Sequence, residues 1–313
     1  MKKLSPNSHI RVLSPSDSIA RLGGFEANLS AKETLENLGF RVSFSEHYLE
    51  SDMLSSSSIK SRVADLHAAF ADDSVDAILA TIGGFNSNEL LPYIDYDLIA
   101  KHPKIICGYS DSTAFLNAIF AKTGNLTYMG PSYSSFKMKE GQDLVKCHDK
   151  ISLWPCSKSR VVQATLGMTQ HNHTILCQQN GKFTTQGKLL APLLVEIYLL
   201  LDSFAEPPYA PQVNDYILFL EEAEEDDYHD FDRNLAAILQ AYPNPKAVLI
   251  GRFPKECQIT PEILTYILDK HPLLKSIPVM YDLDFAHTQP LFTIIIGAQA
   301  SIDTDTLSIH IEE

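Results

Sequence analysis

The chain has 313 residues, of which 45% are apolar and 20% charged, a composition typical of folded globular proteins rather than disordered chains. Its formal net charge of −14 argues against nucleic acids and anionic membrane surfaces as partners, because both would be repelled. No stretch approaches the roughly 18 apolar residues that span a bilayer. The first residues have the charge of a signal peptide but lack its apolar run. We therefore expect a cytoplasmic protein, or one exported by a route that the sequence does not show.

Strand and helix patterns alternate along the first half of the chain. Strands are predicted at 9–13, 40–44, 75–82 and 104–108, and helices at 27–38, 58–70, 88–94 and 112–122. Strands separated by helices pair in parallel through right-handed crossovers. This order predicts an α/β fold in which helices flank a parallel sheet.

The middle of the chain is polar and shows few clear periods. The second half then resumes with predicted helices at 189–201, 232–241 and 261–269, and strands at 216–220, 247–251, 278–280, 291–296 and 307–311. We predict an amino-terminal α/β domain at 1–140, a linking excursion at 141–185, and a smaller carboxyl-terminal α/β domain at 186–313.

The cysteine and histidine pattern argues against a disulfide scaffold or a structural metal site. The five cysteines are odd in number, are scattered, and form no C-x-x-C pair. His171 and His173 have no third ligand at a helpful spacing. We predict reduced, mostly buried thiols and no metal.

Ser110 is the sharpest candidate for chemistry. It lies between the predicted strand 104–108 and the predicted helix 112–122, in the layout of a nucleophile elbow, where a tight turn exposes a serine hydroxyl. The match to G-x-S-x-G is partial, because Ser112 occupies the second glycine position. The backbone N–H groups that begin the helix are suited to an oxyanion. Taken alone, the segment also fits a helix whose cap is Ser110 or Asp111.

Gly83 and Gly84 end another predicted strand. Two glycines allow close approach of a ligand or a strained turn. No phosphate-loop motif follows them. A second oxyanion donor and a plain turn both fit this pair.

Glu221 and His287 complete the set that a serine nucleophile needs. Glu221 ends the predicted strand 216–220, so its backbone is fixed and its carboxylate can orient an imidazole. The rest of the acidic run, 222–227, is expected to be mostly a solvated loop, with Glu222 left open as the other residue that could orient the histidine. His287 lies in a predicted turn. A hydroxyl needs a base, imidazole is the usual one at neutral pH, and a carboxylate fixes its tautomer.

Several blocks resemble a known family. They are 81–84, 90–96, 103–111, 122–124 and 130–131 in the first half, and 218–222, 277–279 and 287–288 in the second. Together they resemble the L,D-carboxypeptidase family of serine peptidases (peptidase family S66), and are most similar to the branch that contains the microcin C self-immunity protein. The Gly-Tyr-Ser-Asp block at 108–111 is the most specific, and the resemblance covers nearly the whole chain.

The resemblance implies a Ser-Glu-His triad. By matching motif, Ser110 is the nucleophile, His287 the general base and Glu221 its orienting partner, while the backbone N–H groups of Gly84 and Asp111 form the oxyanion hole. The serine comes from the first domain and the other two residues from the second, so the family pattern places the site in the cleft between them. A homodimer, and no metal or organic cofactor, are also implied.

The chain departs from the family pattern around the expected substrate pocket. It has Ala191-Pro192-Leu193 where members usually have Gly-Gly-Asn, and Ala286 where they have glycine before the histidine. Three functions stay open. The first is an L,D-carboxypeptidase that removes a terminal D-amino acid from cytoplasmic muropeptides. The second is hydrolysis of aminoacyl- or peptidyl-nucleotide antibiotics, for which Trp154 is a candidate to stack on the base, although a packing role fits it too. The third is a non-catalytic ligand-binding homologue.

Overall fold

The computed structural model describes residues 4–137, 184–190, 209–285, 287–288, 291, 293–303 and 308–312. The chain divides into two compact units. Among the described residues, the first unit holds 4–137, 209–210 and 293–294, and the second unit holds the others. The predicted boundary at 140 and nearly all of the predicted excursion 141–185 lie outside the described residues, and the domain boundaries stay predictions.

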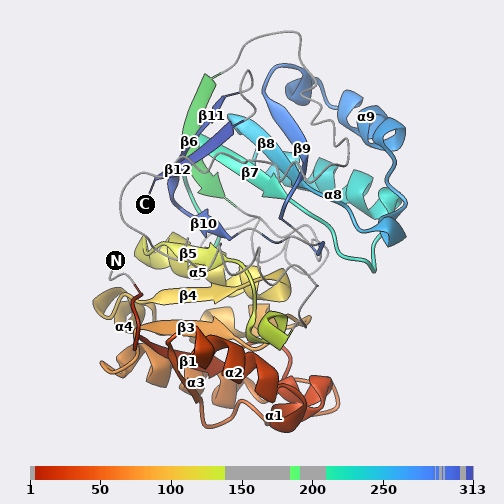
Figure 1. Ribbon diagram of the computed structural model, residues 1–313. Coiled ribbons are helices and arrows are strands. Elements are labelled where there is room, and N and C mark those ends of the chain that lie inside the picture. Colours follow the sequence, from red (N-terminus) through yellow and green to blue (C-terminus); the bar gives the residue numbers. More distant parts are fainter. Residues whose placement is uncertain are drawn as a thin grey trace. The chain divides into compact units, whose positions relative to one another are not determined.

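A parallel sheet forms the centre of the first unit (Figure 1). Its strands are β1 (His9–Leu13), β2 (Arg41–Phe44), β3 (Ala77–Ala80), β4 (Ile105–Gly108) and β5 (Thr127–Met129). They pair in the order β2-β1-β3-β4-β5, all in parallel. The short strand β10 (Ile294–Ile296), which begins in this unit, follows β5 at the sheet's edge. Every residue of β3 and β4 is buried, as expected for a parallel sheet covered by helices.

The helices of the first unit fall close to the predicted ranges. The α-helices are α1 (Gly24–Ala27), α2 (Leu29–Asn37), α3 (Ile59–Ala71), α4 (Tyr96–Lys101) and α5 (Thr113–Thr123). The 3₁₀ helices are η1 (Ile19–Leu22), η2 (Ser87–Tyr93), η3 (Ser110–Ser112) and η4 (Tyr133–Lys137). The predicted helix 27–38 corresponds to α2, and 88–94 is a 3₁₀ helix that contains Pro92. The helix α4 and the strand β5 were not predicted, because they are too short to show a period.

The second unit has its own six-stranded sheet, in the order β12-β11-β6-β7-β8-β9 (Figure 1). The strands β6 (Thr184–Leu190), β7 (Tyr216–Leu220), β8 (Ala247–Gly251) and β9 (Val279–Leu283) are parallel. The strands β11 (Gln299–Asp303) and β12 (Ser308–Glu312) are antiparallel. The helices are α8 (Tyr228–Ala241), α9 (Pro261–Asp269), η5 (Lys255–Cys257) and η6 (Pro272–Lys275). The predicted α/β fold class, with a parallel sheet and a second sheet region, is confirmed.

One predicted element of the second unit is wrong in the part that the structure describes. The predicted helix 189–201 begins inside β6, since residues 189 and 190 are paired strand, and its remaining residues lie outside the described ranges. The predicted helix 232–241 begins four residues earlier, at Tyr228. There Asp227 accepts hydrogen bonds from the first-turn amides, in a capping box with Asp230.

Candidate active site

The turn after β4 holds Ser110 in an unusual backbone conformation. Its φ angle is +58°, a region that few residues other than glycine occupy. Ser110 opens the 3₁₀ turn η3, and α5 begins three residues later. A strand, a strained serine and a helix in this order have the layout that a nucleophile elbow requires, with the serine at the carboxyl end of a sheet.

Gly108 and Ser112 explain why the elbow motif is only partly matched. A Cβ atom at position 108 would lie 2.9 Å from Ser112 Cβ and 3.0 Å from Ala80 Cβ, closer than carbon atoms normally pack. The two flanking positions of the elbow therefore face each other. Because the side chains of Ser112 and Ala80 both lie against it, position 108 has no room for a side chain.

The carboxylate of Asp111 joins the turn after β4 to the turn after β3. Its Oδ2 accepts hydrogen bonds from the backbone N–H groups of Asn86 at 3.1 Å and Ser87 at 2.9 Å. The Ser87 hydroxyl donates to the backbone carbonyl of Asp111 at 2.6 Å. Burial raises the pKa of this carboxyl, against the effect of these hydrogen bonds. The cap of α5 is Ser112, so the alternative in which Ser110 or Asp111 caps that helix is wrong.

The glycine pair after β3 is required by close packing. A Cβ atom at Gly83 would lie 2.8 Å from Ser110 Cβ, and one at Gly84 would lie 2.7 Å from the backbone nitrogen of Asp17. The Asp17 N–H donates to the Gly83 carbonyl at 3.1 Å. Gly83 therefore lies against the serine, and Gly84 lies against the loop that follows β1.

Arg62 makes hydrogen bonds to the loops that follow β1 and β3, a role that was not predicted from the sequence. Its guanidinium is buried and donates to the carbonyls of Pro15 at 3.3 Å and Asn86 at 3.1 Å. It also forms an ion pair with Glu89 at 2.5 Å. An arginine within a predicted amphipathic helix gives no sign that it is buried, so only the long-range contacts reveal this role.

In the second unit, Glu221 and His287 form a hydrogen-bonded pair. Glu221 follows β7 directly, and His287 follows β9. The Nδ1–H of His287 donates to Oε2 of Glu221 at 2.8 Å. The side chains of Glu221 and His287 are 3% and 11% exposed. The neighbouring Glu222, which the sequence left as the other possible partner, does not make this bond.

The surroundings of His287 favour its protonated form. Burial lowers the pKa of the imidazole, but the charge of Glu221 and its hydrogen bond, with the charges of Glu224 and Glu225, raise it above the usual value. An imidazole in this setting accepts a proton more readily than one in water, and the resulting cation is stabilised.

Glu222 is a second buried carboxyl beside the pair. Burial, together with a hydrogen bond that its protonated carboxyl donates to Asp226, raises its pKa to about 10. Its Oε1 accepts a hydrogen bond from the Asn234 amide at 3.4 Å. Glu222 is therefore neutral at physiological pH, although the sequence analysis placed it in a solvated loop.

The predicted site residues are divided between the two units. Ser110, Gly84 and Asp111 lie in the first unit, where hydrogen bonds and packing connect their turns. Glu221 and His287 lie in the second unit and contact each other. Trp154 lies outside the described residues, as do Ala286 and the segment 191–193.

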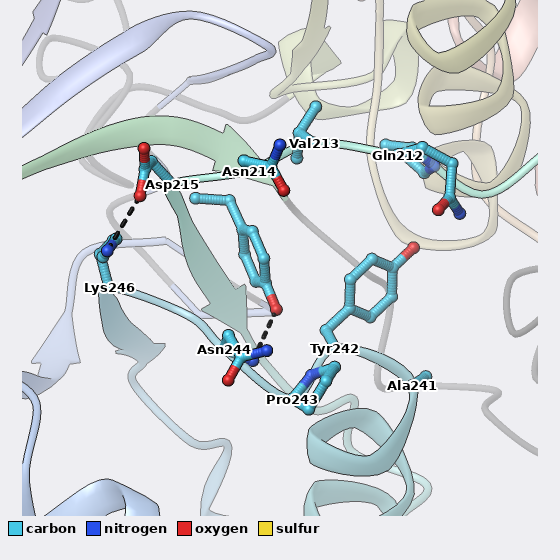
Figure 2. A pocket seen from close by; sticks show the side chains of 11 residues that line it. Gln212, Val213, Asn214, Asp215, Ala241, Tyr242, Pro243, Asn244 and Lys246 are labelled. Carbon is cyan, nitrogen blue, oxygen red and sulfur yellow. Dashed lines mark hydrogen bonds and ion pairs between the residues drawn. The ribbon is translucent and has the colours of Figure 1, made fainter.

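A cavity lies at the amino end of β7 in the second unit. It is lined by residues before β7 and between α8 and β8, including Gln212, Tyr242 and Asn244 (Figure 2). Lys246 forms an ion pair with Asp215 at 2.9 Å on its rim. Glu221 follows the opposite, carboxyl end of β7, so this cavity is separate from the Glu221–His287 pair.

Within the described residues, no three histidine, cysteine, aspartate or glutamate side chains are grouped to hold a metal ion. Across the same residues, no helix has both the length and the apolar character to cross a membrane.

Comparisons with known proteins match both halves of the chain. The model of the LD-carboxypeptidase N-terminal domain matches residues 10–130, and that of the LD-carboxypeptidase C-terminal domain matches residues 197–302. The chain is 38% identical to YocD of Bacillus subtilis, over 96% of this chain and 95% of that protein.

Solved structures cover nearly the whole chain. A MccF-like protein from Bacillus anthracis is 36% identical, with a TM-score of 0.88 over 99% of this chain and 98% of the other. The microcin C7 self-immunity protein MccF of Escherichia coli is 29% identical over 90% of this chain and 86% of that protein. A structure of MccF in complex with glutamyl sulfamoyl guanosine has a TM-score of 0.84 at 26% identity, over 99% of this chain and 97% of the other.

Proposed function

Because the chain belongs to the LD-carboxypeptidase family and is a serine-type carboxypeptidase, we propose that it removes the terminal D-amino acid from muropeptides. In this proposal Ser110 is the nucleophile, His287 the general base and Glu221 the residue that orients the base. The backbone N–H groups of Gly84 and Asp111 hold the oxyanion.

The hydrogen bond between His287 and Glu221 is the observation that carries the proposal. Because Nδ1–H donates to the carboxylate, the neutral ring has its lone pair on Nε2, the nitrogen that a serine hydroxyl needs as its base. The strained backbone at Ser110 supports the nucleophile independently. Each half of the proposed triad thus has its own geometric support within its own unit.

The proposed reaction has two steps. The Ser110 oxygen attacks the carbonyl carbon of the residue that precedes the terminal D-amino acid, and Nε2 of His287 takes the hydroxyl proton. The carbonyl oxygen becomes an oxyanion, which the two backbone N–H groups stabilise. The imidazolium then protonates the leaving amine as the C–N bond breaks. Water, deprotonated by the same imidazole, releases the shortened peptide from the serine.

The oxyanion hole fits the local structure of the first unit. Asp111 directly follows the nucleophile within η3, and the first N–H groups of a helical turn have no acceptor inside it. Gly84 is held two residues before Asn86, whose backbone is bonded to Asp111. In a nucleophile elbow, the oxyanion commonly accepts hydrogen bonds from the backbone N–H of the residue after the serine and from an N–H of a second loop. The turns after β4 and β3 would provide these two donors.

A second substrate class has specific support. A structural relative, MccF, binds glutamyl sulfamoyl guanosine, which favours hydrolysis of aminoacyl-nucleotide compounds as the alternative. The same nucleophile, base and oxyanion donors would serve both substrates, because each reaction transfers an acyl group to serine.

One experiment separates these possibilities. The parent protein and Ser110→Ala are incubated with a tetrapeptide muropeptide and, separately, with an aminoacyl sulfamoyl adenosine, and the products are identified by mass. We expect the parent to release the terminal D-amino acid and Ser110→Ala to release none. Turnover of the nucleotide compound alone would replace the muropeptide by the second substrate. Turnover of neither, with equal binding by both proteins, would favour the non-catalytic homologue. The homodimer and the cytoplasmic location stay predictions.

A further inference from the structure

The order of the first sheet identifies where a ligand is expected. The strand β1 pairs with β2 on one side and with β3 on the other, so the chain changes direction across the sheet between β1 and β3. Open α/β sheets bind ligands at such a switch point, outside the carboxyl ends of the strands. The loop after β1 carries Asp17 and leads into η1, which carries Arg21, and the loop after β3 carries Gly83, Gly84 and Phe85.

Arg21 is a half-exposed cation held at this switch point. Its Nη1 forms an ion pair with Oδ2 of the buried Asp17 at 2.5 Å. The guanidinium carbon lies 5.7 Å from the centre of the Phe85 ring, which is within the range of a cation–π contact. The Arg21 side chain is 43% exposed and Phe85 is 53% exposed. The guanidinium is therefore held by Asp17 and the ring, with surface left open to solvent.

Arg252 shows that one guanidinium in this protein can bind two carboxylates. In the second unit its Nε bonds Asp282 at 3.0 Å and its Nη2 bonds Asp284 at 2.7 Å. Arg21 has one carboxylate partner among the described residues, on Nη1 alone. The planar fork of arginine leaves its other N–H groups directed away from that partner. A ligand carboxylate would give Arg21 the arrangement that Arg252 already has.

Within the described ranges, Arg62 is the other cation shown in contact with these two loops. It is not available to bind a ligand anion. It is buried, and its guanidinium is engaged by Pro15, Asn86 and Glu89. An incoming anion would have to displace contacts that hold the turns in place. Arg21 is open to a ligand where Arg62 is not.

We propose that Arg21 binds the free carboxylate at the end of the substrate, and that Phe85 packs against the apolar atoms of the terminal residue. This inference rests on the proposed function, since it assumes a peptide that is cut next to its carboxyl terminus. The triad chemistry acts on any acyl group and does not itself require a terminal carboxylate. A cation fixed one loop away from Gly84 gives the enzyme a means to select chain ends.

The test compares a tetrapeptide muropeptide that has a free carboxyl terminus with the same peptide ending in an amide. The variant is Arg21→Met, which keeps the aliphatic stem and removes the charge. The matched control is Arg41→Met, because Arg41 lies on β2 and its side chain donates only to the Asn7 carbonyl among the contacts shown. The rate at which a fluorophosphonate labels Ser110 reports the intact nucleophile, since this probe has no carboxylate.

We expect Arg21→Met to raise KM for the free acid about 10- to 100-fold, the usual range for a lost charge-assisted hydrogen bond. We expect kcat to change less than about threefold, because the chemical groups are unchanged. The preference for the acid over the amide should fall by the same factor as KM rises. Arg21→Lys should restore part of it, and Arg41→Met should match the parent in every measurement.

Removal of Arg21 leaves Asp17 buried without its cation, which could destabilise the fold. A second variant therefore separates loss of binding from misfolding. Asp17→Asn combined with Arg21→Met removes both charges, and it should show the same loss of preference while labelling at the parent rate. An unchanged KM in variants that label normally, or equal losses for acid and amide, would overturn the assignment of Arg21. Weaker inhibition by adenosine monophosphate, with an unchanged KM for the acid, would instead assign Arg21 to a phosphate. A parent enzyme that releases no D-amino acid would overturn the proposed function itself, and the Arg21 assignment with it.

Discussion

Gly83 gives the sharpest test of how closely Ser110, the proposed nucleophile, is packed. In Gly83→Ala the new methyl group would lie 2.8 Å from Ser110 Cβ, whereas carbon atoms in contact rest about 3.5–4.0 Å apart. Relief of the clash therefore needs a displacement of about 0.7–1.2 Å. The Oγ atom can rotate away from the methyl group, but Cβ moves only with the backbone, so the whole serine must shift.

A displacement of about 1 Å at a reacting group lowers rates about 100-fold, which corresponds to about 2.7 kcal/mol of activation free energy. We expect kcat/KM and the fluorophosphonate labelling rate of Gly83→Ala to fall by that factor, with little change in thermal stability. Gly124→Ala is the control, because its φ of +71° makes alanine unfavourable while no atom lies within 4 Å of the added methyl. It should lose about 1 kcal/mol of stability and keep its activity. A folded Gly83→Ala that labels within twofold of the parent would refute the packing argument.

Three further predictions follow from the charges around the two turns and the pair. Glu222→Gln should stabilise the protein relative to the parent, and increasingly so from pH 5 to pH 9. A carboxyl with a pKa of about 10 keeps a proton in the folded state that the unfolded chain has released, so the parent loses up to about 1.4 kcal/mol of folding free energy per pH unit. Thermal melts in which the difference in stability between the two proteins does not change with pH would contradict this. In the proposed mechanism the neutral form of His287 is the base, and its pKa is raised, so kcat/KM should fall as the pH drops through that pKa. Glu224→Gln and Glu225→Gln should move this acid limb to lower pH, and the shift should vanish in 1 M salt, where charges are screened within about 3 Å. Asp111→Ala leaves two backbone N–H groups without their acceptor and should reduce kcat about 10- to 100-fold. Asp111→Asn keeps an acceptor oxygen, and its kcat should stay within about fivefold of the parent value. Equal kcat values for the two variants would show that the hydrogen bonds do not position the turn.

The sequence predicts the elbow well because its signals are local. A buried apolar run that ends at Gly108, followed by Ser110 and a helical period, specifies a strand, a turn and a helix without any distant contact. The same holds for α9, which begins at Pro261 as predicted and is capped by Thr260. Local chemistry decides these elements, so the pattern of the sequence is sufficient.

The missed features depend on residues that are far apart in the chain. Arg62 and Asp17 gain their roles from the packing of loops after different strands, which no spacing reveals. The end of β6 was predicted as helix because the apolar residues from 189 onward fit a helical period. Pairing of residues 189 and 190 with β7 makes this segment a strand, an example of tertiary context overriding a local pattern.

The central claim is that Ser110 is activated by His287, and covalent labelling tests it most directly. The parent and His287→Ala are treated with a fluorophosphonate, and the modified peptide is identified and its formation rate measured by mass spectrometry. We predict modification of Ser110 alone in the parent, and a rate at least about 1,000-fold lower in His287→Ala. Modification at another residue, or equal rates in the two folded proteins, would contradict the claim.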